Sequence, residues 1–101
     1  MSKKLFMGVL GLALGLGAAD AARAEMASPI ILANTCFSCH GTDGQSAGAM
    51  PSIKGKPADY IATMLTAFRN GSKQGTVMNR IAKGFSPDEI AALSKYFANQ
   101  Q

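Results

Sequence analysis

Two cysteines and the single histidine of this chain stand together in the run Cys36-Phe37-Ser38-Cys39-His40. Residues three apart share one face of a helix, so the two thiols can reach two groups on one side of a flat ring while the next residue projects towards the centre of that ring. Two cysteines followed by a histidine at this spacing form the attachment signature of a c-type haem. The run predicts one covalent haem c, with thioethers to Cys36 and Cys39 and with His40 as an axial ligand of the iron.

Three other uses of the same residues predict features that the sequence lacks. A thioredoxin-like dithiol would need strands around it, and no alternating or β-branched run supplies them. A zinc site would need four ligands, whereas the two cysteines and His40 make three. A disulfide between Cys36 and Cys39 would leave the histidine without a role.

The start of the chain has the pattern of an export signal. Lys3 and Lys4 precede an apolar stretch at residues 5–19, and residues 22–24 give a small-x-small cleavage site. The apolar stretch is shorter than the roughly 20 residues that a membrane-spanning helix needs, so the sequence favours a cleaved signal peptide over a retained anchor. We expect the mature chain to begin at Glu25 and to lie in the periplasm, an exported location that also suits covalent haem attachment.

The charge of the chain does not indicate a nucleic-acid partner. The formal net charge is +4, but residues 1–24 hold three of the ten basic residues and one of the six acidic ones, so cleavage would leave +2. Two haem propionates would cancel that remainder. Residues 25–101 are few for a stable apolar core, so we expect one domain that needs its covalent haem in order to fold well.

The apolar periodicity predicts an all-α domain with three main helices and a short one. The first helix follows Ser28 and Pro29, which suit the N-cap and first helical position, and it leads into the cysteine run. The second starts at Pro57 and ends at Gly71, a residue that tolerates a left-handed conformation. Its apolar stripe consists of Tyr60, Ile61, Met64, Leu65 and Phe68.

The remaining segments follow from capping and loop residues. Residues 86–89 (S-P-D-E) predict a capping box that starts the last helix, with Ile90, Leu93 and Phe97 facing inward. The short helix is expected between Thr76 and Gly84. The polar, glycine-rich residues 41–56 predict a loop that wraps one side of the haem.

The candidates for a second iron ligand are the methionines. Met26 lies near the expected new N-terminus, and Met64 lies within an apolar stripe where packing alone explains it. Met50 and Met78 stand in loop-like sequence, but Met50 is only ten residues from His40, whereas Met78 follows a complete helix that lets the chain cross to the opposite haem face. The sequence therefore favours Met78, and a filled iron coordination favours electron transfer over substrate chemistry.

These stretches resemble the class I c-type cytochromes and, among them, the cytochrome subunit of flavocytochrome c sulfide dehydrogenase. The resemblance extends over most of residues 25–101. It is carried by residues 36–42 (C-F-S-C-H-G-T), 51–53 (P-S-I) and 78–85 (M-N-R-I-A-K-G-F). The first stretch is generic to c-type cytochromes, and the third is much narrower.

The resemblance implies the small class I cytochrome c fold around one haem. It also implies that Met78 is the second axial ligand and that the carbonyl of Pro51 accepts a hydrogen bond from the imidazole of His40. A flavoprotein subunit would oxidise sulfide and pass its electrons to the haem, so the implied partner is that flavoprotein or another redox protein. The sequence holds one C-x-x-C-H run, as in one-haem members, and no G-x-G-x-x-G run for a flavin.

Three other functions stay open at this point. The first is a free periplasmic shuttle that carries electrons between larger redox enzymes. The second is an enzyme or gas sensor, which would need an open position on the iron. The third is a thiol oxidoreductase that uses Cys36 and Cys39 as a dithiol.

Overall fold

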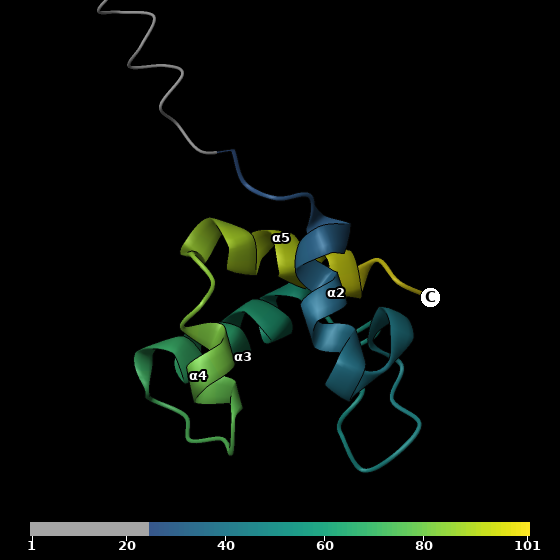
Figure 1. The fold of residues 1–101 in the computed structure, drawn as a ribbon, viewed down its shortest axis with the longest axis horizontal. Coiled ribbons are helices and arrows are strands. Elements are labelled where there is room, and N and C mark those ends of the chain that lie inside the picture. Colours follow the sequence, from purple (N-terminus) through teal and green to yellow (C-terminus); the bar gives the residue numbers. More distant parts are fainter. Residues whose placement is uncertain (1–24) are drawn as a thin grey trace, which may run out of the picture.

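The computed structural model describes residues 25–101, and within that range the chain forms helices and no strand. The elements are α2 (Pro29–His40), the 3-10 turn η1 (Thr42–Gly44), α3 (Ala58–Asn70), α4 (Met78–Ala82) and α5 (Pro87–Ala98). Figure 1 shows α5 lying across one end of the fold, with α2 on one side of the molecule and α3 and α4 on the other. The predicted all-α fold with three main helices and a short one is confirmed, and η1 is an addition that the sequence did not predict.

The predicted signal peptide, residues 1–24, lies outside the described residues. Among the helices of the described part, none combines the length and the apolar character that crossing a membrane requires.

The starts of the two proline-led helices differ. At α5 the hydroxyl of Ser86 accepts a hydrogen bond from the backbone N–H of Glu89 at 3.2 Å, and the Glu89 carboxylate accepts one from the backbone N–H of Ser86 at 2.9 Å. The predicted capping box is therefore present, with Pro87 in the first turn. At α2 the N-cap residue is Ser28, as predicted, but its side chain makes no capping hydrogen bond. The fixed φ of Pro29 starts this helix without help from a side-chain cap.

Helix α3 buries only part of its predicted stripe. Pro57 is its N-cap residue, and Gly71 ends it in the left-handed conformation, with φ of 83°. Ile61 is buried and Met64, Leu65 and Phe68 are half-buried. Tyr60 is 51% exposed, so the covered part of α3 is narrower than the apolar stripe.

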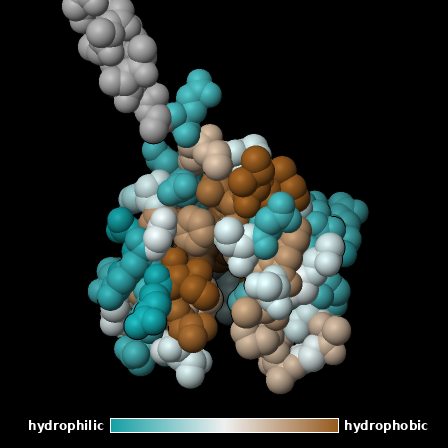
Figure 2. Space-filling model, in the orientation of Figure 1, coloured by the Kyte–Doolittle hydropathy of each residue, from teal (hydrophilic) through white to brown (hydrophobic). Residues whose placement is uncertain are grey.

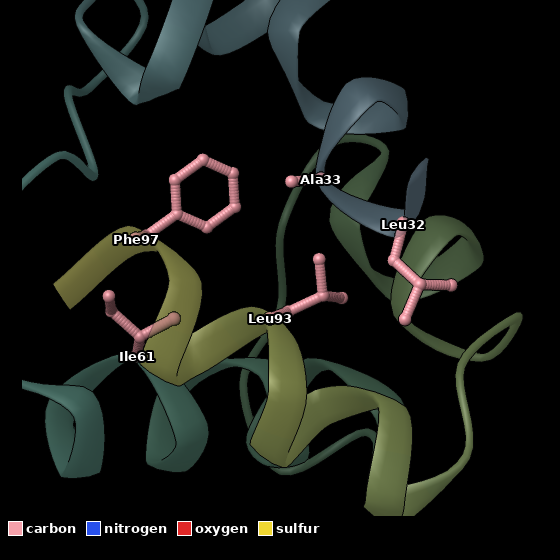
Figure 3. Packing of buried hydrophobic residues seen from close by; sticks show 5 residues of the cluster. All are labelled: Leu32, Ala33, Ile61, Leu93 and Phe97. Atoms are coloured by element: carbon pink, nitrogen blue, oxygen red, sulfur yellow. The ribbon is translucent and has the colours of Figure 1, made fainter. Parts of the chain in front are cut away.

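The hydrophobic core lies where α5 packs against α2 and α3 (Figure 3). It consists of Leu32, Ala33, Ile61, Leu93 and Phe97. Phe97 also contacts the rings of Phe37 and Tyr96, with ring centroids 6.2 and 5.2 Å apart. The predicted inward positions of α5 are confirmed, because Ile90, Leu93 and Phe97 are all at most 3% exposed.

The packing divides the molecule into two sides that share α5. Helix α2 packs on α5 and η1, whereas α4 packs on α3, which in turn packs on α5. Figure 2 shows a hollow between the two sides at the end of the molecule away from α5, with apolar surface beside it. The cysteine run is on one side of the molecule, and Met78 is on the other.

Candidate functional site

His40 is held in one orientation by a backbone carbonyl. It is the last residue of α2, is 9% exposed, and its Nδ1 lies 2.6 Å from the carbonyl oxygen of Pro51. A carbonyl oxygen only accepts hydrogen bonds, so Nδ1 carries the proton and donates it. Nε2 is then the ring nitrogen with a lone pair for a metal ion. The hydrogen bond that the resemblance implied between His40 and Pro51 is present.

A tight turn directly after His40 makes this contact possible. Gly41 has φ of 84°, and a Cβ atom there would lie 1.9 Å from the carbonyl oxygen of Gln45, so only glycine fits. Gly44 has φ of 85°, and its carbonyl oxygen accepts hydrogen bonds from the backbone N–H groups of Ile53 and Lys54 at 2.9 and 3.2 Å. The loop therefore closes on itself and returns to the imidazole, which explains how a polar, glycine-rich segment can position a ligand.

A second contact fastens the same turn to α5. The hydroxyl of Tyr96 donates a hydrogen bond to the carboxylate of Asp43 at 2.8 Å, and Asp43 itself has a left-handed φ of 56°. Partial burial raises the pKa of Tyr96, and the hydrogen bond to Asp43 raises it further. Sequence reasoning missed this pair, since the two residues are far apart in the chain and neither belongs to a recognisable motif.

Cys36 and Cys39 both lie on α2 and are not joined by a disulfide. Cys36 is half-buried and Cys39 is exposed. Burial raises the pKa of the Cys36 thiol, although a contact with the hydroxyl of Thr35 at 3.8 Å acts in the opposite direction. Residues 25–101 contain no group of three or more His, Cys, Asp or Glu side chains that could hold a metal ion.

Met78 is the first residue of α4, on the other side of the molecule from the cysteine run, and it is half-buried. The sequence placed Met78 in a loop-like stretch, whereas the helix α4 begins at this residue. Met50 is covalently joined to Pro51, whose carbonyl binds His40, so it starts from the His40 side of the site. The position of Met50 therefore favours Met78 as the iron ligand on the side opposite His40. Met64 is half-buried within α3, and Met26 is 48% exposed before α2.

The residues present suit a haem c. Val77, the N-cap residue of α4, and Ile81 within α4 are 52% and 39% exposed although both are apolar. Figure 2 shows apolar surface beside the hollow. A flat apolar ring in that hollow would remove such surface from water, which is favourable by about 25 cal/mol per Å². Cys36 and Cys39 would supply the thioether sulfurs, and the oriented imidazole of His40 would supply a nitrogen ligand of the iron, all from the end of one helix. This donor set fits haem c and leaves one iron position for a residue from the other side.

A match to a known protein family extends over all of the described residues. Residues 24–101 match the model of the family described as Cytochrome c.

Three similar proteins illustrate the match. The cytochrome subunit of sulfide dehydrogenase from Chlorobaculum tepidum is 51% identical over 69 residues, which cover 68% of this chain and 63% of that protein. Cytochrome c-554(548) from Halomonas halodenitrificans is 37% identical over 71 residues, which cover 66% of this chain and 86% of that protein. The solved structure of Acidithiobacillus ferrooxidans cytochrome c4 matches with a TM-score of 0.59 and 40% identity over 62% of this chain and 37% of that one. The chain thus spans less than two thirds of the first of these relatives.

Proposed function

Since the chain belongs to the cytochrome c family as a class I c-type cytochrome with one covalently bound haem c, we propose that it is a periplasmic electron carrier whose haem iron lies between His40 and Met78. The observation that carries this proposal is the hydrogen bond from Nδ1 of His40 to the carbonyl of Pro51 at 2.6 Å. It fixes the tautomer and the direction of the imidazole, as outer hydrogen bonds do for metal-bound histidines.

Each residue of the proposed site has a separate task. Cys36 and Cys39 would hold the ring covalently, and His40 and Met78 would bind its iron. A thioether ligand together with an imidazole would favour a raised reduction potential. When bound, haem c supplies a one-electron couple, and the protein's part is to hold its ligands still and to keep water from the iron.

The first experiment tests the ligand Met78. A thioether ligand gives the ferric protein a weak near-infrared absorption band, which we expect in the wild type and expect to vanish in Met78→Ala. Cyanide should then bind the ferric variant rapidly at neutral pH. Met64→Ala is the matched control, because it removes another methionine of residues 25–101 and should keep the band. A band that survives Met78→Ala would contradict the assignment, and rapid cyanide binding by a wild type without the band would favour an enzyme or sensor.

We further propose that the protein is the cytochrome subunit that accepts electrons from a sulfide-oxidising flavoprotein. The support is the 51% identity to the sulfide dehydrogenase cytochrome subunit of Chlorobaculum tepidum. The test is purification of the tagged protein from the periplasm of its native host. A second chain that carries flavin, together with reduction of the haem by sulfide, is the expected result. A protein that purifies only as a free monomer would contradict it.

A free electron shuttle is the alternative function, and one observation favours it. The chain spans 86% of the small Halomonas halodenitrificans cytochrome, so a protein of about this size exists as a cytochrome in its own right. Shuttles dock briefly and are steered by charge, so their electron-transfer rates fall strongly with ionic strength. A lone one-haem protein with such a salt dependence would make the shuttle the better account.

A further inference from the structure

The side chain of Asn79 joins three separate parts of the backbone. Its Nδ2 group donates hydrogen bonds to the carbonyl oxygens of Phe68 and Lys73, at 3.0 and 2.7 Å, and its Oδ1 accepts one from the backbone N–H of Gly75 at 2.8 Å. Phe68 belongs to the last turn of α3, where helix carbonyls lack partners within the helix. Asn79 therefore fastens residues 71–77, which connect α3 to α4, to the end of α3.

This network lies directly beside Met78. Asn79 is the second residue of α4 and Met78 is the first. Successive residues of a helix differ in direction by a fixed angle, so an anchored Asn79 also fixes the direction in which Met78 leaves the helix.

Close packing at Gly75 adds to this constraint. A Cβ atom at Gly75 would lie 2.9 Å from the ring of Phe68 and 3.4 Å from Cβ of Met78. The backbone at Gly75 thus lies close to both the ring of Phe68 and Cβ of Met78, and a side chain at Gly75 would press on the Phe68 ring. The hydrogen bond from Gly75 to Asn79 and the packing at Gly75 therefore both constrain the segment beside Met78.

We propose that Asn79 is a positioning residue, which keeps the sulfur of Met78 directed at the haem iron by fastening residues 71–77 to α3. This inference rests on the proposed ligation by Met78. The helix α4 has only five residues, and its few internal hydrogen bonds cannot fix its orientation on their own. The rigidity needed for a lasting sulfur–iron bond therefore comes from the hydrogen bonds of the neighbouring side chain.

The test uses the haem-loaded protein with two variants. Asn79→Ala removes all three hydrogen bonds, whereas Asn79→Asp keeps the acceptor for the N–H of Gly75 and removes both donors. We expect both to weaken the near-infrared band of the ferric protein and to speed cyanide binding at neutral pH, with a rise of at least about tenfold for Asn79→Ala. Tenfold corresponds to about 1.4 kcal/mol in the equilibrium that frees the iron.

Asn70→Ala is the matched control. Asn70, the last residue of α3, accepts one hydrogen bond from the backbone N–H of Ser72 in the connecting segment at 2.9 Å, and this hydrogen bond does not involve α4. Its loss should lower thermal stability without changing the band or the cyanide rate, which separates positioning from general loosening. Unchanged band and cyanide rate in both Asn79 variants, with the band present in the wild type, would overturn the inference. A wild type without the band would instead show that the proposed ligation by Met78 is itself wrong.

Discussion

At the scale of single residues, the proline whose carbonyl orients His40 has a role that its side chain alone does not explain. The contact is made by the backbone of Pro51, and the ring stiffens that backbone by fixing φ. A strong hydrogen bond from Nδ1 increases the electron donation of the imidazole to a metal ion, which favours the oxidised state of the iron. Pro51 therefore both stiffens the loop and influences the reduction potential of the iron.

Pro51→Ala keeps the carbonyl and loses the stiffness. We expect a weaker hydrogen bond to His40, a higher reduction potential, and a loss of about 0.4–1 kcal/mol of stability through the freer unfolded chain. Spectroelectrochemical titration and denaturant unfolding would measure the two effects. Pro57→Ala is the control, because Pro57 precedes α3 and should share the stability loss without the change in potential. Equal potentials in the Pro51→Ala variant and the wild type would contradict the assigned role.

The contact between Tyr96 and Asp43 predicts a dependence of stability on alkaline pH. Partial burial and the hydrogen bond to Asp43 raise the pKa of Tyr96 above the value of about 10 in the unfolded chain. The folded protein therefore holds this proton more tightly, and the resulting stabilisation is complete below about pH 10 and is lost as the pH rises through the folded pKa. Tyr96→Phe should be less stable than the wild type at pH 7, and the difference should shrink above pH 10. Unfolding free energies that differ by a constant amount from pH 7 to 11 would contradict this.

At the scale of elements, the beginnings of α2 and α5 form a natural comparison, because both have serine followed by proline. Ser86 makes the side-chain hydrogen bond of a cap and Ser28 does not. Ser86→Ala should therefore cost about 1 kcal/mol of unfolding free energy. Ser28→Ala should change it by less than about 0.5 kcal/mol. Denaturant unfolding of the two variants would decide, and equal losses would contradict the assigned caps.

Elements and their ends could be predicted wherever the information is local. The capping box at residues 86–89 and the left-handed Gly71 are local signals, and both are confirmed. The C-x-x-C-H spacing is equally local, and the family match supports the haem c that it predicts. The exposure of Tyr60 and the missing side-chain hydrogen bond at the N-cap residue Ser28 could not be predicted, because neighbouring elements decide how these side chains are placed.

The site itself was predictable only in part. The pairing of His40 with Pro51 was expected from family resemblance, not from periodicity, since a backbone carbonyl leaves no mark in a hydrophobic pattern. The three hydrogen bonds of Asn79 were not predicted at all. Asparagine beside a glycine-containing segment is ordinary loop composition, and only the return of residues 71–77 to the end of α3 gives it a function.

At the scale of the whole molecule, we expect the covalent haem to supply apolar contacts that the small hydrophobic core of the protein does not provide. The buried cluster of the described residues is small, and α4 packs mainly on α3. A chain of this size with so small a core gains much of its stability from a group that both sides contact. The double variant Cys36→Ala/Cys39→Ala, prepared without haem, should therefore show no cooperative thermal transition by circular dichroism. The haem-loaded wild type is the control, and a sharp transition in the haem-free chain would contradict the expectation.

The position of α5 has a practical consequence for experiments on electrodes. This helix packs against both α2 and α3, and it lies at the end of the molecule away from the hollow (Figures 1 and 2). Its outer positions Ala91 and Lys95 are exposed. A tether fixed to that outer surface would turn the hollow towards the solution and away from the conductor, so current would have to cross the thickness of the protein. Adsorption through the opposite end would bring a haem held between His40 and Met78, as proposed, close to the conductor, and the two orientations would differ in voltammetric rate without any change in the protein.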